Sequence, residues 1–524
     1  MRRLLDGRNL FLGLASSLLA GCAAVGPDFQ RPVAPVTPDW LLADLEEFKT
    51  KPEELVEWWE LFGDPVLNEV IDLAHQNNNN LKIAGLRVLE ARAALGIAVG
   101  NQYPQSQVLA GDATAIGASE SNANTTAGDL SYTQYNLGVS ASWEIDFWGK
   151  FRRGIESADA TLLASIADFD DVLILLTAQV ADTYTVIRVT EERLRIAREN
   201  LETQQRSYDI ATVLYKNGEN SELDALQALT LLLATKATIP SFESALRQAR
   251  NALNTLLGRP PGDISALLAG SSAVPNAPEI LSVGIPADML RQRPDVRQAE
   301  MQAMAQNARV GVARADLYPS FSIRGSLGLA AADGTNTTRT GESGFGELFR
   351  AESLVYSVGP SFVWPFLNYG RIKNNIRVQD ARLQQALIAY RETVIQAARE
   401  VEDSMAAFTG ANEEVEILRE TVSAARRSSE ISLLRYTEGF ADYQRVLNAQ
   451  QSLFTQEQRY ASTQGDVVRA LIGMYRGLGG GWQNRQSESY VDGETREQME
   501  NRTDWGDQLE PGQVTTHQVK LEDE

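Results

Sequence analysis

The side chains that usually carry out chemistry are scarce in this chain of 524 residues, which has two histidines, His75 and His517, and one cysteine, Cys22. A cysteine and histidine zinc site, or a thiol–imidazole pair, needs more of these residues close together. His75 falls in a predicted helix and His517 in an acidic tail, so neither belongs to a nucleophile arrangement. The glycine-rich stretch 477–481 follows a predicted helix and not a strand, which argues against a phosphate-binding loop. We therefore expect no enzyme activity, no metal site and no cofactor.

Cys22 ends a segment that is typical of an export signal. A basic stretch, residues 1–8, precedes an apolar run, residues 9–19, that is too short to span a bilayer permanently. The motif Leu19-Ala20-Gly21-Cys22 resembles the bacterial lipoprotein box. This resemblance implies cleavage before Cys22 and attachment of lipid (palmitate included) to its sulfur and new amino group, with Ala23 favouring the outer membrane. The alternative is a free thiol after an ordinary signal.

The composition excludes several classes of protein. Hydrophobic residues make up 43% of the chain, which is too high a share for a disordered protein. The formal net charge is −21, and phosphates need a cationic surface, so nucleic acid is not an expected partner. After the signal, we find no stretch of the ~18–20 apolar residues that a spanning helix needs. Any membrane span must therefore consist of β-strands.

The sequence contains an internal repeat. Tyr103-Pro104 recurs as Tyr318-Pro319, at an offset of 215 residues, and further along the chain the offset becomes 221. Pairs at the second offset are Trp143 with Trp364, Gly149 with Gly370, Tyr215 with Tyr436, Gly218 with Gly439, Leu226 with Leu447 and Gly258 with Gly479. A constant register over more than about 100 residues indicates a tandem duplication.

Each copy is predicted to contain two strands in which apolar and polar residues alternate. Loops rich in glycine, serine, threonine and asparagine, 117–131 and 332–352, separate the two strands of each copy. Such alternation is found in membrane β-strands and also in half-buried strands of a soluble sandwich. The strand after Pro104 alternates weakly. The apolar sets of the other three are Leu137, Val139, Ala141, Trp143 and Ile145; Phe321, Ile323, Leu327 and Leu329; and Tyr356, Val358, Phe362 and Trp364.

Long helices with heptad spacing follow the strands. Between 153 and 216 the heptad positions form one apolar stripe, and the second copy repeats it. At 1.5 Å per residue the helix is roughly 95 Å long, which is longer than any globular core. Flanking helices are expected over about 67–101 and 222–257, which together would complete a second column. The stripe residues are Ile166, Leu173, Val180, Ile187, Leu194, Leu201, Tyr208 and Tyr215, and then Leu387, Val394, Val401, Phe408, Val415, Val422, Ser429 and Tyr436.

The number of strands in one chain forces assembly if they cross a membrane. Four strands cannot close a barrel, and an open sheet edge cannot face lipid. Two chains would give eight strands and a filled interior, whereas three give twelve strands and a lumen. Three chains also supply twelve helical columns, which at a spacing of ~10 Å enclose a tube nearly 40 Å across. The predicted fold class is therefore mainly α with a membrane β-barrel, formed by a trimer.

Several motifs resemble the outer membrane factor family of TolC-like outer-membrane efflux proteins, in its lipoprotein branch. The resemblance covers residues 22–482. Its motifs are Val25-Gly26-Pro27-Asp28-Phe29, Trp58-Trp59, Asp64-Pro65, Gly284-Ile285-Pro286-Ala287-Asp288-Met289-Leu290, Arg293-Pro294-Asp295-Val296, the segment Tyr436 to Gln450, and Leu478-Gly479-Gly480-Gly481-Trp482.

This resemblance implies a homotrimer in the outer membrane, with a 12-stranded barrel, a periplasmic helical barrel and an equatorial belt. It also implies the exit duct of a tripartite efflux pump for small molecules, such as those involved in multidrug resistance, docked to a periplasmic adaptor and an inner-membrane transporter. The lipid anchor favours partners of the resistance–nodulation–division class. Two alternatives remain at this point, a type I protein secretion duct and a periplasmic coiled-coil lipoprotein that forms no pore. The cargo, the particular pump and the resting state of the pore are not predicted.

The chain is divided by these features into six parts. They are a signal peptide (1–21), a lipid-anchored equatorial segment (22–65), a first efflux repeat (66–258), an equatorial linker (259–286), a second repeat (287–482) and an acidic disordered tail (483–524).

The two helical hairpins end in short turns that we expect to dock the adaptor. Gly218 and Gly439 can adopt a positive φ where a helix ends. Ser221, with Asp224 at capping-box spacing, and Asp442 can cap the helices that follow.

Gln444 and Asn448 lie one turn apart near the second hairpin turn, and we expect three copies of each to close the tube as a periplasmic gate. Members of the family usually have a segment that resembles Tyr-Leu-x-Leu-Leu-Asp-Ala-Gln at this position. This chain has Gln444 in place of the leucine and Asn448 in place of the aspartate. Neutral amides do not repel one another and bind cations weakly. We therefore expect a gate that divalent cations affect little, with a solvated Asn448 as the alternative.

Aromatic residues gather at one end of the predicted strands. Trp143, Trp148, Trp364 and Tyr369 are expected to form an interfacial girdle of the barrel, as aromatic residues do in outer-membrane barrels. A girdle argues against the coiled-coil lipoprotein without a pore.

Overall fold

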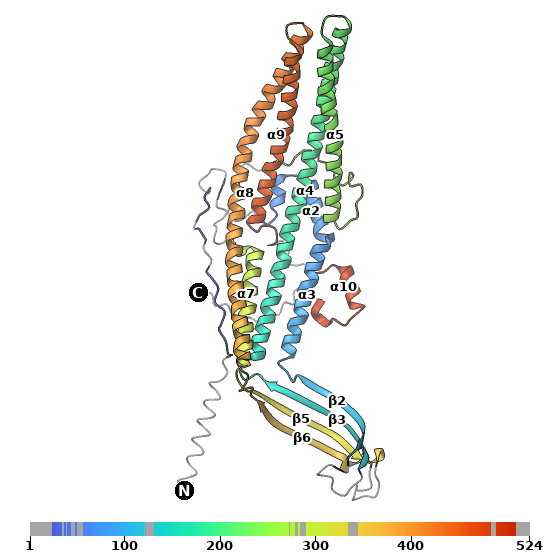
Figure 1. Ribbon diagram of the computed structural model, residues 1–524, viewed down its shortest axis with the longest axis vertical. Coiled ribbons are helices and arrows are strands. Elements are labelled where there is room, and N and C mark those ends of the chain that lie inside the picture. Colours follow the sequence, from blue (N-terminus) through green and yellow to red (C-terminus); the bar gives the residue numbers. More distant parts are fainter. Residues whose placement is uncertain are drawn as a thin grey trace.

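The computed structural model describes residues 24–33, 36–37, 39–42, 48–49, 56–119, 121, 130–271, 273–277, 281–282, 290–333, 344–483 and 489–509. The molecule is elongated, with a four-stranded sheet at one end and two helical hairpins at the other (Figure 1). Cys22, the export signal and the motif residues 284–289 lie outside the described residues.

The sheet is antiparallel, in the order β2-β3-β5-β6, which leaves β2 and β6 as its two edges. The two copies meet in its centre, where β3 pairs with β5. Pro360, which has no N–H to donate, lies in the edge strand β6, as expected for proline in a sheet. The strands are β2 (Ser106–Gly117), β3 (Ser131–Ile145), β5 (Ser320–Ala332) and β6 (Leu354–Val363).

The two faces of the sheet differ in chemistry, as the alternation predicts. Across one face, the register aligns Leu109, Val139, Leu327 and Tyr356, all of which are exposed. Across the other face, serines 140, 326 and 357 lie in a row, and the hydroxyls of the last two are 2.9 Å apart. A sheet with an exposed apolar face and a polar face suits a barrel wall between lipid and water.

Corresponding long helices of the two repeats have equal lengths. The long helices α4 and α8 each contain 67 residues, and their hairpin partners α5 and α9 each contain 35. In both long helices the heptad stripe is buried through the middle of the molecule. The ranges are α3 (Asn79–Gly100), α4 (Lys150–Lys216), α5 (Glu222–Leu256), α7 (Pro294–Ala315), α8 (Arg371–Thr437) and α9 (Tyr443–Gly477).

The structure has two helices where the sequence predicted a single one. Instead of a continuous helix over 67–101, α2 (Pro65–Asn77) and α3 are separated at Asn78, which has an extended backbone. The side-chain oxygen of Asn78 accepts a hydrogen bond from the Leu81 backbone N–H, and its amide donates to the Leu256 carbonyl. Asparagine favours such an N-cap position over a helix interior because its side chain competes for backbone groups.

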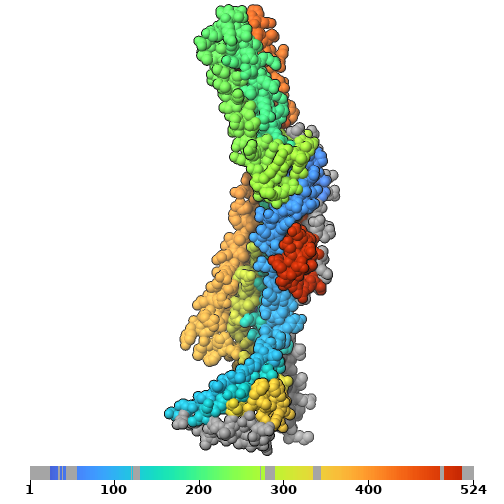
Figure 2. Space-filling model, turned by 90° about the vertical axis from the view of Figure 1, so that its right-hand side faces the viewer, coloured from blue at the N-terminus to red at the C-terminus, as the bar shows by residue number. Residues whose placement is uncertain are grey.

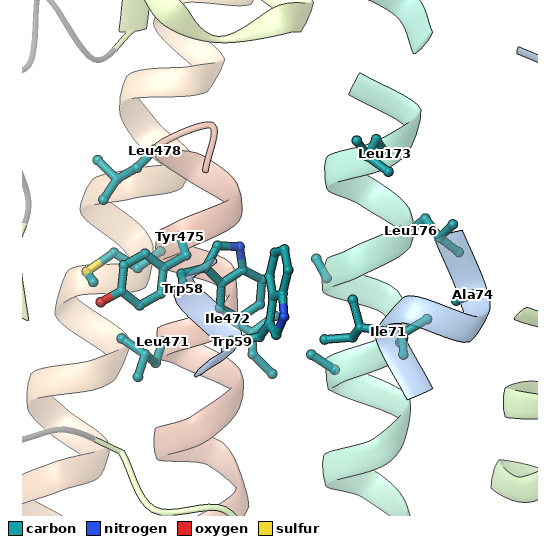
Figure 3. Packing of buried hydrophobic residues seen from close by; sticks show 14 of the residues in the cluster. Trp58, Trp59, Ile71, Ala74, Leu173, Leu176, Leu471, Ile472, Tyr475 and Leu478 are labelled. Carbon is teal, nitrogen blue, oxygen red and sulfur yellow. The ribbon is translucent and has the colours of Figure 1, made fainter. Parts of the chain in front are cut away.

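The core lies at the middle of the long axis, where the N-terminal segment meets the helices. Trp58 is fully buried, and its ring is stacked on that of Tyr475 in α9 at 5.4 Å (Figure 3). The segments on either side of the first repeat also meet, because β1 (Phe48–Lys49) pairs in parallel with β4 (Leu281–Ser282). Through the contact of Trp58 with Tyr475, the Trp58-Trp59 motif packs against the end of the second repeat.

The prediction of a disordered tail is wrong for residues 489–509. They contain α10 (Gly493–Glu500) and a 3₁₀ turn (Gly506–Leu509) and pack on α3, where Val491, Met499 and Leu509 bury Leu89. The acidic composition misled the prediction because a few apolar residues, spaced to reach one helix face, suffice when that helix already exists. Residues 484–488 and 510–524 lie outside the described residues.

By length and composition, one described helix, α5, is apolar enough to cross a membrane, although the sequence analysis found no such stretch. It forms a hairpin with α4, at the end of the molecule away from the sheet (Figure 1). Its exposed leucines, such as Leu226 and Leu233, are available to other chains.

Candidate channel, gate and docking tips

Both hairpin turns have the geometry that the glycines predict. The φ angles of Gly218 and Gly439 are 77° and 78°. In the first turn Glu219 N–H donates to the Leu214 carbonyl at 2.9 Å, and in the second Phe440 N–H donates to the Arg435 carbonyl at 2.8 Å. These are the bonds of a left-handed helix end, and a side chain at either glycine would strain the backbone.

The helices after the turns start with side-chain caps. Ser221 Oγ accepts a hydrogen bond from the Leu223 N–H at 3.0 Å, and Asp442 Oδ1 accepts one from the Arg445 N–H at 3.2 Å. The capping predictions for both residues are therefore confirmed. Whether the turns bind an adaptor stays a prediction.

The two tips pack on each other through tyrosines. Tyr436 and Tyr443 are buried with their rings edge to face at 5.2 Å, and the Tyr436 hydroxyl donates to Asp224 of the first hairpin at 3.3 Å. Burial raises the pKa of both phenols, so they stay protonated at neutral pH. This contact fixes one tip relative to the other.

Sequence reasoning missed the apolar surface of the tips. Phe440 is 72% exposed at the second turn, and Leu434 and Leu223 are more than half exposed nearby. The duplication pairs Phe440 with Glu219, so the two tips present different surfaces. An exposed aromatic residue directly after a turn glycine was the available signal.

The predicted gate residues are in contact with each other. Gln444 donates its amide to Asn448 Oδ1 at 3.0 Å, and Gln227 of the first hairpin donates to Gln444 Oε1 at 3.3 Å. Both predicted residues are exposed. The gating role stays a prediction, and Gln227, which the sequence analysis did not single out, belongs to the same amide chain.

The predicted girdle residues lie where the sheet joins the helices, in two environments. Trp143 and Trp364 are partly exposed, and their indole N–H groups donate to the carbonyls of Gln102 and Leu317, both at 3.1 Å. Trp148 is half-buried, stacked on Tyr318, whereas Tyr369 is 99% exposed. Their contact with lipid stays a prediction.

A buried polar seam joins the two hairpins below the tips. Asn200 of α4 donates to Glu457 of α9 at 2.7 Å, and Arg426 of α8 donates to the other oxygen of the same carboxylate at 2.7 Å. About two turns nearer the tip, Gln450 donates to Ser207 at 2.6 Å. These contacts bind α9 to α4 across the two repeats.

Charged residues are also buried at the level of the core. Arg293 donates to Asp295 at 2.7 Å, to Glu400 at 3.1 Å and to the Gly477 carbonyl at the end of α9. Burial, together with the nearby Asp295 carboxylate, raises the pKa of Asp171 to about 6. The Arg293-Pro294-Asp295 motif thus ties the start of α7 to α8 and α9.

His75 has a structural environment. Burial lowers its pKa to about 4, so the ring is neutral at physiological pH. Its Nε2 lies 2.8 Å from the Thr177 hydroxyl, and Trp59 packs edge to face on the ring. Within the described residues, no three histidine, cysteine or acidic side chains are grouped so as to hold a metal ion.

An open four-stranded sheet with an apolar outer face, joined to helices of 67 residues, defines a membrane channel that continues into an α-helical tube. The family of outer membrane efflux proteins matches residues 70–259 and 285–480, which correspond to the two repeats. The chain belongs to this family.

Similar proteins match this chain over most of its length. The toluene efflux pump outer membrane protein TtgF of Pseudomonas putida is 30% identical over 495 residues, 91% of this chain and 98% of the relative. The probable outer membrane lipoprotein SilC of Salmonella typhimurium is 29% identical over 469 residues, 89% of this chain and 97% of the relative. The solved structure of the outer-membrane channel OprN has a TM-score of 0.81 and 29% identity, covering 88% of this chain and 100% of that one.

The predictions of family, fold class, outer membrane location and efflux function are confirmed. The chain is an outer membrane efflux channel of the trimeric kind that works in tripartite pumps with an adaptor and an inner-membrane transporter. The family is one of transport ducts.

Proposed function

We propose that three copies of this chain form a continuous exit duct that is anchored by lipid at Cys22, docked to the adaptor at its hairpin tips and closed at rest by amide side chains. The duct carries small molecules and catalyses no reaction. The observation that supports the duct is the pairing of an open amphipathic sheet with duplicated helices of 67 residues in one chain.

The tips are proposed as the docking surface because they combine rigidity with exposed apolar side chains. Tyr436, Tyr443 and Asp224 hold the two turns together, while Phe440 and Leu223 remain exposed. A fixed apolar patch at the end of a helical tube suits a helical partner of similar shape.

The gate is proposed at the amide chain of Gln227, Gln444 and Asn448. Threefold symmetry would bring three copies of the chain around one axis. Amides hydrogen-bond to one another without the repulsion of carboxylates, so they hold the tube closed without a bound cation.

A conductance experiment tests the duct. Purified trimer in a planar bilayer should show a low conductance that rises when Gln444→Ala and Asn448→Ala remove the amide contacts, and expression of the wild type in a strain that lacks its own duct should restore efflux. A double variant that inserts as a trimer without conducting would contradict the proposal. Intact-mass analysis should show acyl groups on a chain that begins at Cys22, and an unmodified mass would contradict the lipid anchor.

A further inference from the structure

The C-terminal segment 489–509 lies beyond the region that matches the family, which ends at residue 480. It is attached to α3 by specific contacts. Arg92 donates to the Gln508 carbonyl at 2.5 Å, Lys82 pairs with Asp492 at 3.3 Å, and Leu89 is buried against Val491 and Met499.

Gly85 makes this attachment possible. A Cβ at Gly85 would lie 1.8 Å from the Tyr490 carbonyl oxygen, so the segment and the helix are in direct backbone contact. In the view of Figure 2, the segment stands out from α3 at the edge of the molecule that faces the viewer.

The internal repeat places this segment opposite a second one. The N-terminal segment 24–33 lies on α7, the counterpart of α3, and uses the same positions. Glu300, Met304 and Asn307 correspond to Gly85, Leu89 and Arg92 at the offset of 215. In the second copy, Arg31 pairs with Glu300 at 2.6 Å, Phe29 packs in the cluster of Met304, and Asn307 donates to the Pro27 carbonyl at 2.9 Å.

The N-terminal segment does more than cover α7, because it also reaches the neighbouring long helix α4. Arg153 of α4 donates to Asp28 at 2.6 Å, and Ala160 of α4 is buried in the same cluster as Phe29. The segment therefore bridges the groove between α4 and α7. The C-terminal segment reaches α4 at one side of α3, where Tyr490 packs edge to face on Phe169 at 5.4 Å. Within the described residues, α4 is the α-helix that packs along α3, so the other side of α3 is open to a neighbouring subunit.

The internal repeat indicates which helix would lie at the other side of α3 in a trimer. Within the chain, α4 packs on both α3 and α7, whereas α8 packs on α7 at one side and forms the opposite edge of the molecule (Figure 1). If the duplication continues around the trimer, α8 meets the next subunit's α3 as α4 meets α7. Ala381 of α8 is then the counterpart of Ala160, at the offset of 221.

The free edge of α8 carries the side chains of an unfinished interface. Val378, Ile388 and Ile395 are 46%, 56% and 47% exposed, whereas their counterparts Ser157, Ala167 and Ile174 in α4 are 7%, 1% and 3% exposed. By comparison with their counterparts, Val378, Ile388 and Ile395 are expected to be buried by another subunit, although they are exposed in a single chain.

The charges of the two surfaces are complementary. Residues 489–509 contain six acidic and two basic side chains, with Glu494, Glu497 and Glu500 exposed. Residues 371–391 of α8 contain five basic and one acidic side chain, with Arg377 and Arg382 exposed beside Ala381. Complementary charge orients such a contact and excludes other registers.

We propose that residues 489–509 form a clamp between subunits: the clamp is held on α3 of its own chain and contacts α8 of the neighbouring subunit around Ala381. It covers the groove between subunits as residues 24–33 cover the equivalent groove within each chain. The proposal goes beyond the duct function and uses only the trimer.

Cross-linking tests the contact directly. The variant Glu497→Cys with Ala381→Cys, treated with a short bis-maleimide, should give dimer and trimer bands on a denaturing gel. The two residues lie at opposite edges of one chain, so a cross-link between them joins two subunits. The parent protein and each single variant control for reaction at Cys22. The matched control for position is Glu497→Cys with Glu420→Cys, in which the second cysteine lies in a remote part of α8. A pair that stays monomeric, or that reacts no more than the controls, overturns the proposal.

Charge exchange tests the energetics. Glu497→Lys with Glu500→Lys should shift the trimer–monomer equilibrium in detergent toward monomer by about tenfold, since several ion pairs act together. Adding Arg377→Glu and Arg382→Glu should restore the trimer. The matched control, Glu202→Lys with Asp209→Lys on the far half of α4, should leave it unchanged. Circular dichroism checks that each variant is folded. A loss of trimer that Arg377→Glu and Arg382→Glu do not reverse would overturn the clamp. An equal loss of trimer in the control variant would also overturn it.

Discussion

Asp171 is a half-buried carboxylate whose pKa lies close to physiological pH. Its pKa is raised to about 6 by burial first and then by the Asp295 carboxylate, against a partial offset by Arg293. The folded chain therefore favours the protonated form. The stabilising contribution of this proton is present below pH 4 and is lost as the pH rises through about 6.

The substitution Asp171→Asn should remove this dependence. The neutral amide carries no charge to be desolvated, so we expect the variant to be more stable than the wild type by about 1–2 kcal/mol at pH 7–8, with little gain at pH 4. Thermal melting of the purified protein across this pH range measures the difference. Asp209→Asn, at an exposed site, is the control, and an equal gain at both pH values would contradict the assignment.

Asn448 should control how the channel responds to divalent cations. Because the amide contacts of Gln227, Gln444 and Asn448 are neutral, millimolar divalent cations should alter the conductance of the wild type little. Asn448→Asp should create three carboxylates around the axis, and the same cations should then block the channel strongly. Asn448→Ala should remain insensitive.

A strong block of the wild-type channel by divalent cations, with no further effect of Asn448→Asp, would contradict this gate. The constriction would then lie elsewhere along the tube.

Single residues were predictable where one local rule decides their conformation. A helix followed by glycine, and then by serine or aspartate, indicated the turns at Gly218 and Gly439 and the caps at Ser221 and Asp442. Gln227 and Arg293 could not be assigned in the same way. Their partners Gln444 and Glu400 lie 217 and 107 residues away, and such contacts follow from how the two repeats superimpose in space.

The hairpin is the element that connects the tube to its partner, and its turn geometry leads to a prediction. A β-branched residue at φ near +78° strains the backbone, so Gly218→Val with Gly439→Val should reshape both tips. Efflux should be lost while trimers persist, because the tips lie far from the sheet and the central core. Drug susceptibility and trimer content are measured on the same cells.

A matched control exists within the chain. Gly410 lies inside α8 with no neighbour within 4 Å of an added Cβ, so Gly410→Ala should leave efflux and assembly unchanged. Phe440→Ala removes exposed apolar surface without backbone strain and should weaken efflux by itself. Normal efflux in the glycine double variant would exclude docking at the tips.

At the scale of elements, periodicity predicted helices and strands well and their ends less well. The heptads of α4 and α8 extended to the turn glycines, and the alternation of β3 and β5 predicted their faces. The alanines at the end of β5 do not alternate, so the end of this strand could not be read from the pattern. The break at Asn78 and the folding of α10 depend on tertiary contacts, with Leu256 and with Leu89 respectively.

The whole molecule has two means of holding itself in the membrane, a proposed lipid on Cys22 and the sheet. A closed barrel satisfies every strand edge, so β6 of one subunit must pair with β2 of the next. With alternate directions along the order β2-β3-β5-β6, that pairing is again antiparallel. Assembly therefore closes both the sheet and the helical tube around the same axis.

The sheet should be the dominant anchor of the two. Acyl chains contribute about 0.8 kcal/mol per buried CH₂ and hold a protein reversibly when they act alone. A barrel whose backbone bonds are all made within the assembly does not leave the bilayer. We therefore expect Cys22→Ser to retain trimers in the membrane after a carbonate wash. In contrast, Leu109→Lys with Val358→Lys places charges on the apolar face and costs about 2–4 kcal/mol for each residue near the midplane, which should reduce membrane-assembled trimer sharply. Val108→Lys, whose side chain belongs to the polar face, is the matched control. Release of Cys22→Ser trimers by the wash would reverse the order of the two anchors.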